Sequence, residues 1–243
     1  MRFFWCFLAV FFWGAAAVRA DILLVKKAGQ GRIKCEDGME FLLNGKEAGA
    51  KSILPNKDLI VIDVRRARLV LFRDGRIFKS YAVAVGKPET PTPVGEWRIM
   101  HKGGNWGGGF GERWMGLNVP WGIFGIHGTN KPSSIGSMAS HGCIRMFNRS
   151  VIELYRLVQV GTPVYIMGDL PRVSPRRVMQ RPQAGRDILL LQYALRAAGF
   201  DPGMANARFG PATEAALLKF QIYYGLPPTG KAQFNEQYLL GMR

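Results

Sequence analysis

The sequence predicts a mainly β domain followed by a small all-α domain. From residue 58 to residue 167, short runs rich in β-branched and aromatic residues follow one another closely, separated by turn residues. From residue 187 to residue 243, apolar residues recur instead at the spacing of amphipathic helices. With 243 residues and 48% hydrophobic content, the chain is long enough to bury a core in both parts.

Four runs begin the expected β domain: 59–64, 68–72, 76–85 and 95–100. Asp74-Gly75 and the Pro- and Thr-rich stretch 88–93 are typical of turns between such strands. The glycine-dense segment 103–116 predicts a long loop.

The β domain continues with an apolar run over 123–127 and with the segment 140–146. Ser150 is then expected to cap a helix over 151–158, and 162–167 to form a closing strand. We therefore expect this domain to end at residue 167.

Residues 168–186 are rich in arginine and proline and predict a solvated linker. The domain 187–243 should hold three helices: one behind Asp187 as N-cap, one opened by Pro211 and ended by Gly225, and one over 232–240.

The N-terminus predicts export. Arg2 precedes an apolar run over 3–18, and Val18-Arg19-Ala20 places small residues where signal peptidase needs them. We expect residues 1–20 to be a signal peptide cleaved after Ala20, with an uncleaved anchor as the alternative. Residues 21–57 indicate no role beyond a hairpin around Asn44-Gly45.

The charge indicates a polyanionic partner, because 33 Lys and Arg against 17 Asp and Glu give a net charge of +16. Nucleic acid, anionic lipid and cell-wall polymers all fit this charge. Export to the cell envelope makes nucleic acid an unexpected partner and limits membrane contact to the signal or anchor. We expect a monomer.

Of the three cysteines, Cys6 lies in the expected signal, which leaves Cys35 and Cys143. A disulfide between these two would fit an oxidising compartment. We prefer a reduced Cys143, because two of the three histidines, His127 and His141, lie within sixteen residues of it. A Cys-His pair is the minimum needed for acyl transfer to a thiol.

The residues alone leave open whether His127 or His141 is the base. Gly128 and Gly142 allow close backbone approach, and amides near Cys143 could form an oxyanion hole. A zinc site is the rival interpretation, but the sequence holds neither HExxH nor CxxC. We expect no metal and no cofactor.

The motif His127-Gly128-Thr129, followed by Ser140-His141-Gly142-Cys143-Ile144-Arg145-Met146, resembles the signature of the L,D-transpeptidase (YkuD) catalytic domain. The resemblance covers residues 59–167 and includes Val85-Gly86-Lys87, 90–95 and 161–164. Residues 191–230 resemble the three-helix peptidoglycan-binding domain, although Asn206-Ala207 stands where that family often has Asp-Gly.

The first resemblance implies a β-sandwich with a short helix, in which Cys143 is the nucleophile and His127 the general base. It implies that the Gly128 carbonyl holds the imidazole and that His141 and Gly142 line the oxyanion pocket. Arg145 would meet a substrate carboxylate or organise the site, with a surface salt bridge as the alternative. Ser140 is expected to support the turn by hydrogen bonding. The remaining candidates for contact with substrate are Ser140, Trp114 and Trp121, although core packing is the alternative for both tryptophans.

The resemblance implies an enzyme that releases D-alanine from tetrapeptide stems of peptidoglycan through a Cys143 thioester and then forms a 3→3 cross-link. If water accepts the acyl group, the enzyme is an L,D-carboxypeptidase. A non-catalytic wall-binding protein and a papain-like peptidase are the competing functions. The papain-like peptidase is disfavoured because His127 precedes Cys143 here.

Overall fold

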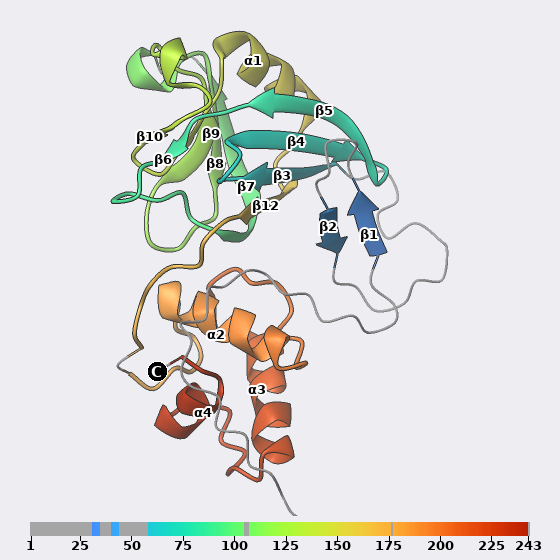
Figure 1. The fold of residues 1–243 in the computed structure, drawn as a ribbon, viewed down its shortest axis with the longest axis vertical. Coiled ribbons are helices and arrows are strands. Elements are labelled where there is room, and N and C mark those ends of the chain that lie inside the picture. Colours follow the sequence, from blue (N-terminus) through green and yellow to red (C-terminus); the bar gives the residue numbers. More distant parts are fainter. Residues whose placement is uncertain (1–30, 35–39, 44–57, 105–106, 176, 243) are drawn as a thin grey trace, which may run out of the picture.

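A β domain and a three-helix domain make up the described part of the chain, and they are joined by the segment after residue 167 (Figure 1). The computed structural model describes residues 31–34, 40–43, 58–104, 107–175 and 177–242. The expected signal segment, Cys35 and the Asn44-Gly45 turn lie outside these residues. A short antiparallel pair, β1 (Gly31–Lys34) and β2 (Glu40–Leu43), precedes the β domain.

Eight strands form one continuous sheet in the order β11-β9-β8-β7-β12-β3-β4-β5. Their bounds are β3 (Leu59–Asp63), β4 (Arg68–Arg73), β5 (Arg76–Ala82), β7 (Gly95–Gly104), β8 (Arg113–Leu117), β9 (Phe124–His127), β11 (Ile144–Arg145) and β12 (Pro163–Met167). Two further strands, β6 (Val85–Gly86) and β10 (Met138–Ser140), pair in parallel beside this sheet.

The sheet curls so that both of its halves cover one core. Ile60 and Leu71 from β3 and β4 belong to the same buried cluster as Met115 and Ile126 from β8 and β9. Helix α1 (Asn148–Leu157) adds Val151 and Leu154, both fully buried. Packing two halves of a sheet face to face is how a sandwich buries its apolar residues.

The C-terminal domain contains α2 (Arg186–Ala197), α3 (Pro211–Tyr223) and α4 (Phe234–Leu239). Leu191, Leu195 and Phe220 belong to a separate core of its own. The expectation of a mainly β domain followed by a small all-α domain is therefore confirmed. Within the described residues, no helix has the length and apolar character needed to cross a membrane.

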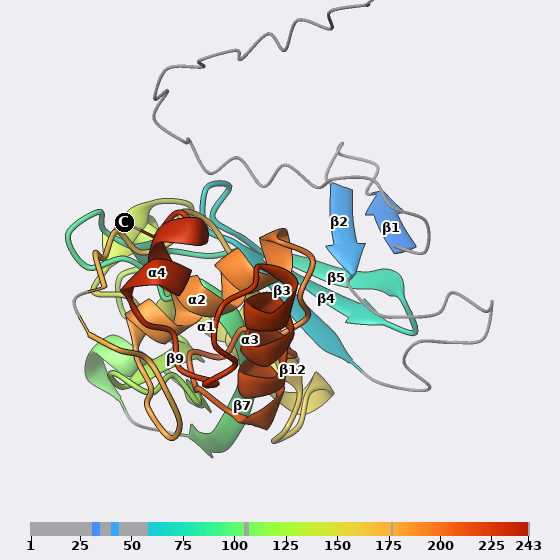
Figure 2. The ribbon, with the colours of Figure 1, turned by 90° about the horizontal axis from the view of Figure 1, so that it is seen from below.

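The two domains are docked against each other. Arg196 of α2 pairs with Glu96 of β7 at 2.6 Å between Nη1 and Oε1, and the backbone amide of Ala205 donates to Glu96 Oε2 at 2.9 Å. The Glu96 amide in turn donates to the Ala205 carbonyl at 2.9 Å. Figure 2, which views the molecule from the helical side, shows α2 and α3 lying over the β domain.

Several local expectations were wrong. Segment 103–116 is not one long loop, because β8 occupies Arg113–Leu117 and pairs with β7 and β9. Strand pairing on both sides overrides the low β-propensity of its glycine. The N-caps also differ: Phe147 and Gly185 precede α1 and α2, with no side-chain cap at either.

The expected linker is only partly solvated. Met179 is fully buried in the core of the C-terminal domain, and it forms a β-bridge with Ala232. Asp187 does not cap α2 from the N-cap position but pairs with Arg177 from inside the first turn. One apolar residue in an arginine-rich stretch carries no periodicity, so its burial leaves no signal in the sequence.

Candidate active site

Parallel pairing of two short strands brings the segments that carry the predicted nucleophile and base side by side. Ile144 of β11 lies opposite Ile126 of β9, and Arg145 lies opposite His127. Because side chains alternate along a strand, the residues at 125, 127, 143 and 145 lie on one face. Cys143 therefore lies beside Gly125, diagonally from His127. Gly125 has no side chain, and a Cβ there would approach Trp114 Cζ2 to 2.6 Å, so only glycine lets Trp114 pack at this point of β9.

The turn before Cys143 is held by Ser140. The Ser140 hydroxyl donates to the Cys143 carbonyl at 2.5 Å and accepts from the Gly142 amide at 3.1 Å. Ser140 is 1% exposed, so these bonds are shielded from water. The prediction that Ser140 supports the turn by hydrogen bonding is confirmed. Its burial leaves little surface for contact with substrate.

Gly142 can only be glycine in this turn. Its φ is 110°, and a Cβ there would approach Phe124 Cε1 to 2.6 Å. The Gly142 amide already donates to Ser140, whereas the Cys143 amide donates to no group within the described residues. The Cys143 amide is therefore the better candidate for an oxyanion donor than the Gly142 amide.

His127 is held by a backbone carbonyl. Its Nδ1 lies 2.5 Å from the Gly128 oxygen, and because a carbonyl can only accept, Nδ1 carries the proton. The neutral imidazole then has its lone pair on Nε2, the nitrogen that can take a proton. Asn148 Oδ1 accepts from the Thr129 amide at 3.0 Å and lies where a Cβ on Gly128 would be, so Gly128 must also be glycine.

Aromatic rings enclose the imidazole. Trp114 of β8 lies opposite His127 in register and stacks on it, with ring centroids 5.4 Å apart. Phe110 covers it edge-on at 5.2 Å. On the far side of Trp114, its Nε1 donates to His101 Nε2 at 2.9 Å. His127 is consequently only 3% exposed.

Burial keeps both members of the pair neutral. It lowers the pKa of His127 to about 4, against the opposing effect of the Gly128 carbonyl, and the charge of Arg145 lowers it further. Burial also raises the pKa of the Cys143 thiol, although the Gly125 backbone and Arg145 act in the opposite direction. In the structure, loss of solvation outweighs those neighbours.

The other predicted site residues differ in exposure and in their partners. Arg145 makes no ion pair among the described residues, so the interpretation as a surface salt bridge is not realised there. His141 is exposed and, unlike His127, has no tethered ring nitrogen in the described structure. Of the two tryptophans, Trp114 is 1% exposed and packs behind the imidazole, whereas Trp121 is half-buried against Trp97.

Two contributors to the site, Asn148 and Phe110, were not predicted from the sequence. Asn148 is the first residue of α1, and Phe110 lies in a one-turn helix over Gly108–Phe110. Neither type is a usual acid or base, and no motif marks Asn148 although it follows Cys143 by only five residues. The close approach of residues 111 and 128 to Asn148 shows its place, and ring contacts with His127 show that of Phe110. No group of three or more possible metal ligands occurs in the described part of the chain.

Two known protein families match parts of this chain. Residues 57–166 match the L,D-transpeptidase catalytic domain, and residues 184–235 match the peptidoglycan binding domain.

Individual relatives match about half of this chain. The chain is 44% identical over 133 residues to a protein of Bacillus licheniformis named as the L,D-transpeptidase YkuD, covering 51% of this chain and 79% of the relative. It is 46% identical over 107 residues to the Bacillus subtilis protein of the same name, covering 44% of this chain and 64% of that relative.

Among solved structures, the catalytic domain of the Enterococcus faecium L,D-transpeptidase is 26% identical with a TM-score of 0.41. That match covers 47% of this chain and 99% of the other.

Proposed function

The chain belongs to the L,D-transpeptidase family, and from this premise we propose that it cross-links peptidoglycan through an acyl group carried on Cys143. The observation that supports the proposal is the parallel pairing of β9, which ends in the buried, carbonyl-tethered His127, with β11, which Cys143 directly precedes. A thiol beside a neutral imidazole is the arrangement that acyl transfer requires.

In the first half-reaction, Cys143 Sγ attacks the carbonyl carbon of the L-centre that precedes the terminal D-alanine of a tetrapeptide stem. The thiol proton moves to His127 Nε2, and the carbonyl oxygen gains negative charge. The Cys143 amide, which donates to no other group in the described structure, is positioned to stabilise that oxyanion. The carbon–nitrogen bond then breaks, His127 returns the proton to the departing amine, and a thioester remains.

In the second half-reaction, an amine from another stem gives its proton to His127 and attacks the thioester. The new amide forms, and Cys143 leaves as the thiol after regaining the proton. Because the raised thiol pKa and the lowered imidazole pKa keep the resting pair neutral, proton transfer accompanies attack rather than preceding it.

The partly exposed Arg145 side chain provides a charge for a stem carboxylate, since it has no carboxylate partner in the described structure. Trp121 remains a candidate for the wall of the stem-peptide groove. The helical domain and the net charge of +16 would hold the enzyme on an anionic wall polymer. Export to the envelope through residues 1–20 completes the proposal.

Hydrolysis of the same thioester would make the protein an L,D-carboxypeptidase. Thioesters react faster with a well-placed amine than with water, so binding of an acceptor stem favours transfer. Mass mapping of products from isolated wall treated with the purified enzyme separates the two activities. We expect a 3→3 dimer, whereas tripeptide monomer alone would assign the carboxypeptidase.

The proposal is tested by following D-alanine release from a tetrapeptide stem. Wild-type protein should release it, and Cys143→Ala should not, because the variant lacks the sulfur that carries the acyl group. Undiminished release by the variant would refute the proposal.

A further inference from the structure

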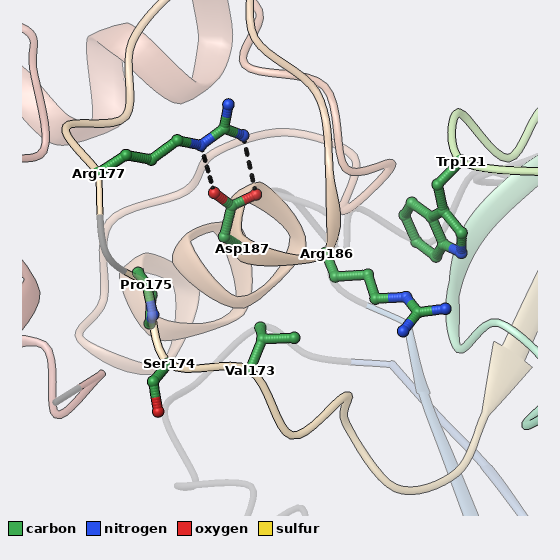
Figure 3. Close-up of a pocket in the computed structure, with 7 residues that line it drawn as sticks. All are labelled: Trp121, Val173, Ser174, Pro175, Arg177, Arg186 and Asp187. Carbon is green, nitrogen blue, oxygen red and sulfur yellow. Dashed lines mark hydrogen bonds and ion pairs between the residues drawn. The ribbon is translucent and has the colours of Figure 1, made fainter. Parts of the chain in front are cut away.

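A cavity of about 530 Å³ lies where the β domain meets the helical domain. Its walls come from three parts of the chain: the loop between β8 and β9, the connecting segment, and the first turn of α2 (Figure 3). The lining residues are Trp121, Val173, Ser174, Pro175, Arg177, Arg186 and Asp187. Its size is within the range of pockets that hold small organic ligands.

The walls combine an aromatic ring with an uncompensated cation. Arg177 is neutralised by Asp187, at 2.7 Å between Nε and Oδ2. Arg186, in contrast, has no ion pair among the described residues, and its guanidinium carbon lies 5.7 Å from the centroid of the Trp121 ring. A guanidinium presents a fork of donors that matches a carboxylate, and an indole presents a broad apolar face.

The loop that carries Trp121 also reaches the Cys143 thiol. Cys143 Sγ lies 3.9 Å from the carbonyl oxygen of Ile123, which follows Trp121 by two residues in the same loop. Two residues of chain span at most about 7 Å. A ligand that rests on Trp121 is therefore close enough to extend one end to Cys143.

The docking of the domains fixes Trp121 of the β domain relative to Arg186 of the helical domain. The Glu96–Arg196 pair is 14% and 20% exposed in its side chains, and the reciprocal backbone bonds between Glu96 and Ala205 add a second constraint. Trp121 itself is braced edge-on by Trp97, with centroids 5.6 Å apart. Such preorganisation lowers the entropic cost of binding.

We propose that this cavity is a substrate subsite for a saccharide that carries an anionic peptide, with the sugar on Trp121 and a peptide carboxylate on Arg186. The inference rests on the proposed function for its ligand class and adds a binding residue, Arg186, that lies outside the catalytic domain. One wall strand would then contact both domains, and the cavity would direct its stem toward Cys143.

The test measures binding rather than catalysis, in full-length protein carrying Cys143→Ala. The probes are a disaccharide-tetrapeptide and the same compound with its free carboxylates amidated, each titrated by calorimetry. Adding Arg186→Gln should raise the dissociation constant of the first probe about tenfold, as expected for a charge-assisted hydrogen bond at a partly exposed site. The same substitution should change the dissociation constant of the amidated probe less than about twofold.

Arg208→Gln is the matched control, because Arg208 is also an exposed arginine of the helical domain and does not line the cavity. It should leave both dissociation constants unchanged. Arg186 lies in the first turn of α2, where a cation opposes the helix dipole, so its replacement should not destabilise the helix.

An equal loss of affinity for both probes would overturn the proposal, as would no loss, or no measurable binding by the Cys143→Ala protein. Because D-alanine release is not the readout, these results stand apart from failure of the proposed function. Failure of the proposed function would appear as a wild-type enzyme that releases no D-alanine, whatever the effect of Arg186→Gln on the two dissociation constants.

Discussion

Arg145 lies opposite His127 in the parallel pair of β11 and β9, so the neighbouring strand carries a cation at the register position of the imidazole. Its charge acts in the same direction as burial and lowers the pKa of His127. The imidazole is therefore neutral, and able to accept a proton, well below neutral pH.

Activity should consequently persist to low pH. A base with its pKa at about 4 loses function only as pH falls through that value, whereas an unperturbed histidine would do so near about 6.5. Arg145→Gln removes the neighbouring charge and should move the acid limb of the kcat/KM profile to higher pH. Arg149→Gln, an exposed arginine of α1, should leave the limb in place. An acid limb of the wild-type kcat/KM profile near the pKa of an unperturbed histidine would contradict this account.

Ser140→Ala should disable the turn at Cys143. The change leaves the Gly142 amide and the Cys143 carbonyl without their partner at a site that is 1% exposed. We expect a loss of about 1–3 kcal/mol in the free energy of unfolding and a fall in D-alanine release of at least about tenfold. Denaturant unfolding and the release assay measure the two effects. Ser137→Ala, whose hydroxyl bonds an exposed carbonyl, is the control and should be nearly silent in both.

Gly142→Ala separates steric contact from backbone strain. Gly142 and Gly136 both have positive φ, at 110° and 93°, but only at Gly142 would a Cβ meet another atom, Phe124 Cε1 at 2.6 Å. Gly136→Ala should cost only the strain of the backbone, about 1–3 kcal/mol. Gly142→Ala should cost more and reduce activity about 100-fold, since it displaces the nucleophile. Thermal unfolding and activity measure the two variants. If Gly142→Ala and Gly136→Ala had equal effects, the Phe124 ring would have moved to make room for the new Cβ, and the prediction would be wrong.

Glu96→Gln should uncouple the two domains. The change leaves Arg196 charged and only 20% exposed, which we expect to cost about 1–3 kcal/mol after allowance for its partial solvation. Calorimetry should show the helical domain unfolding at a lower temperature, and protease should cleave the segment between the domains faster. Arg181→Ala, which breaks the more exposed Arg181–Glu214 pair, should do neither. An unchanged unfolding profile in Glu96→Gln would mean that other contacts hold the domains together.

Features with a local signature could be predicted from the sequence. Cys143 and His127 carry recognisable chemistry, and apolar runs such as β3 and β12 carry the period of strands. The helix opened by Pro211 was also placed correctly, because proline has a fixed φ that suits the first helical position.

Features that depend on distant contacts escaped prediction. Strand β8 forms from a glycine-dense segment because β7 and β9 pair on either side of it. The pKa of Cys143 is raised by burial, which no local motif reports. The cavity beside Trp121 joins residues of the β8–β9 loop to Arg186 and Asp187 of α2, so only the docked domains show it.

The central claim is that Cys143 carries the acyl group, and intact-mass measurement after acid quenching tests it most directly. Wild-type enzyme mixed with a tetrapeptide stem should gain the mass of the stem less D-alanine, with the adduct mapped by peptide digestion to the fragment that contains Cys143. Cys35→Ala should gain the same mass. D-alanine release without any adduct at Cys143, or an adduct mapped to another residue, would contradict the account.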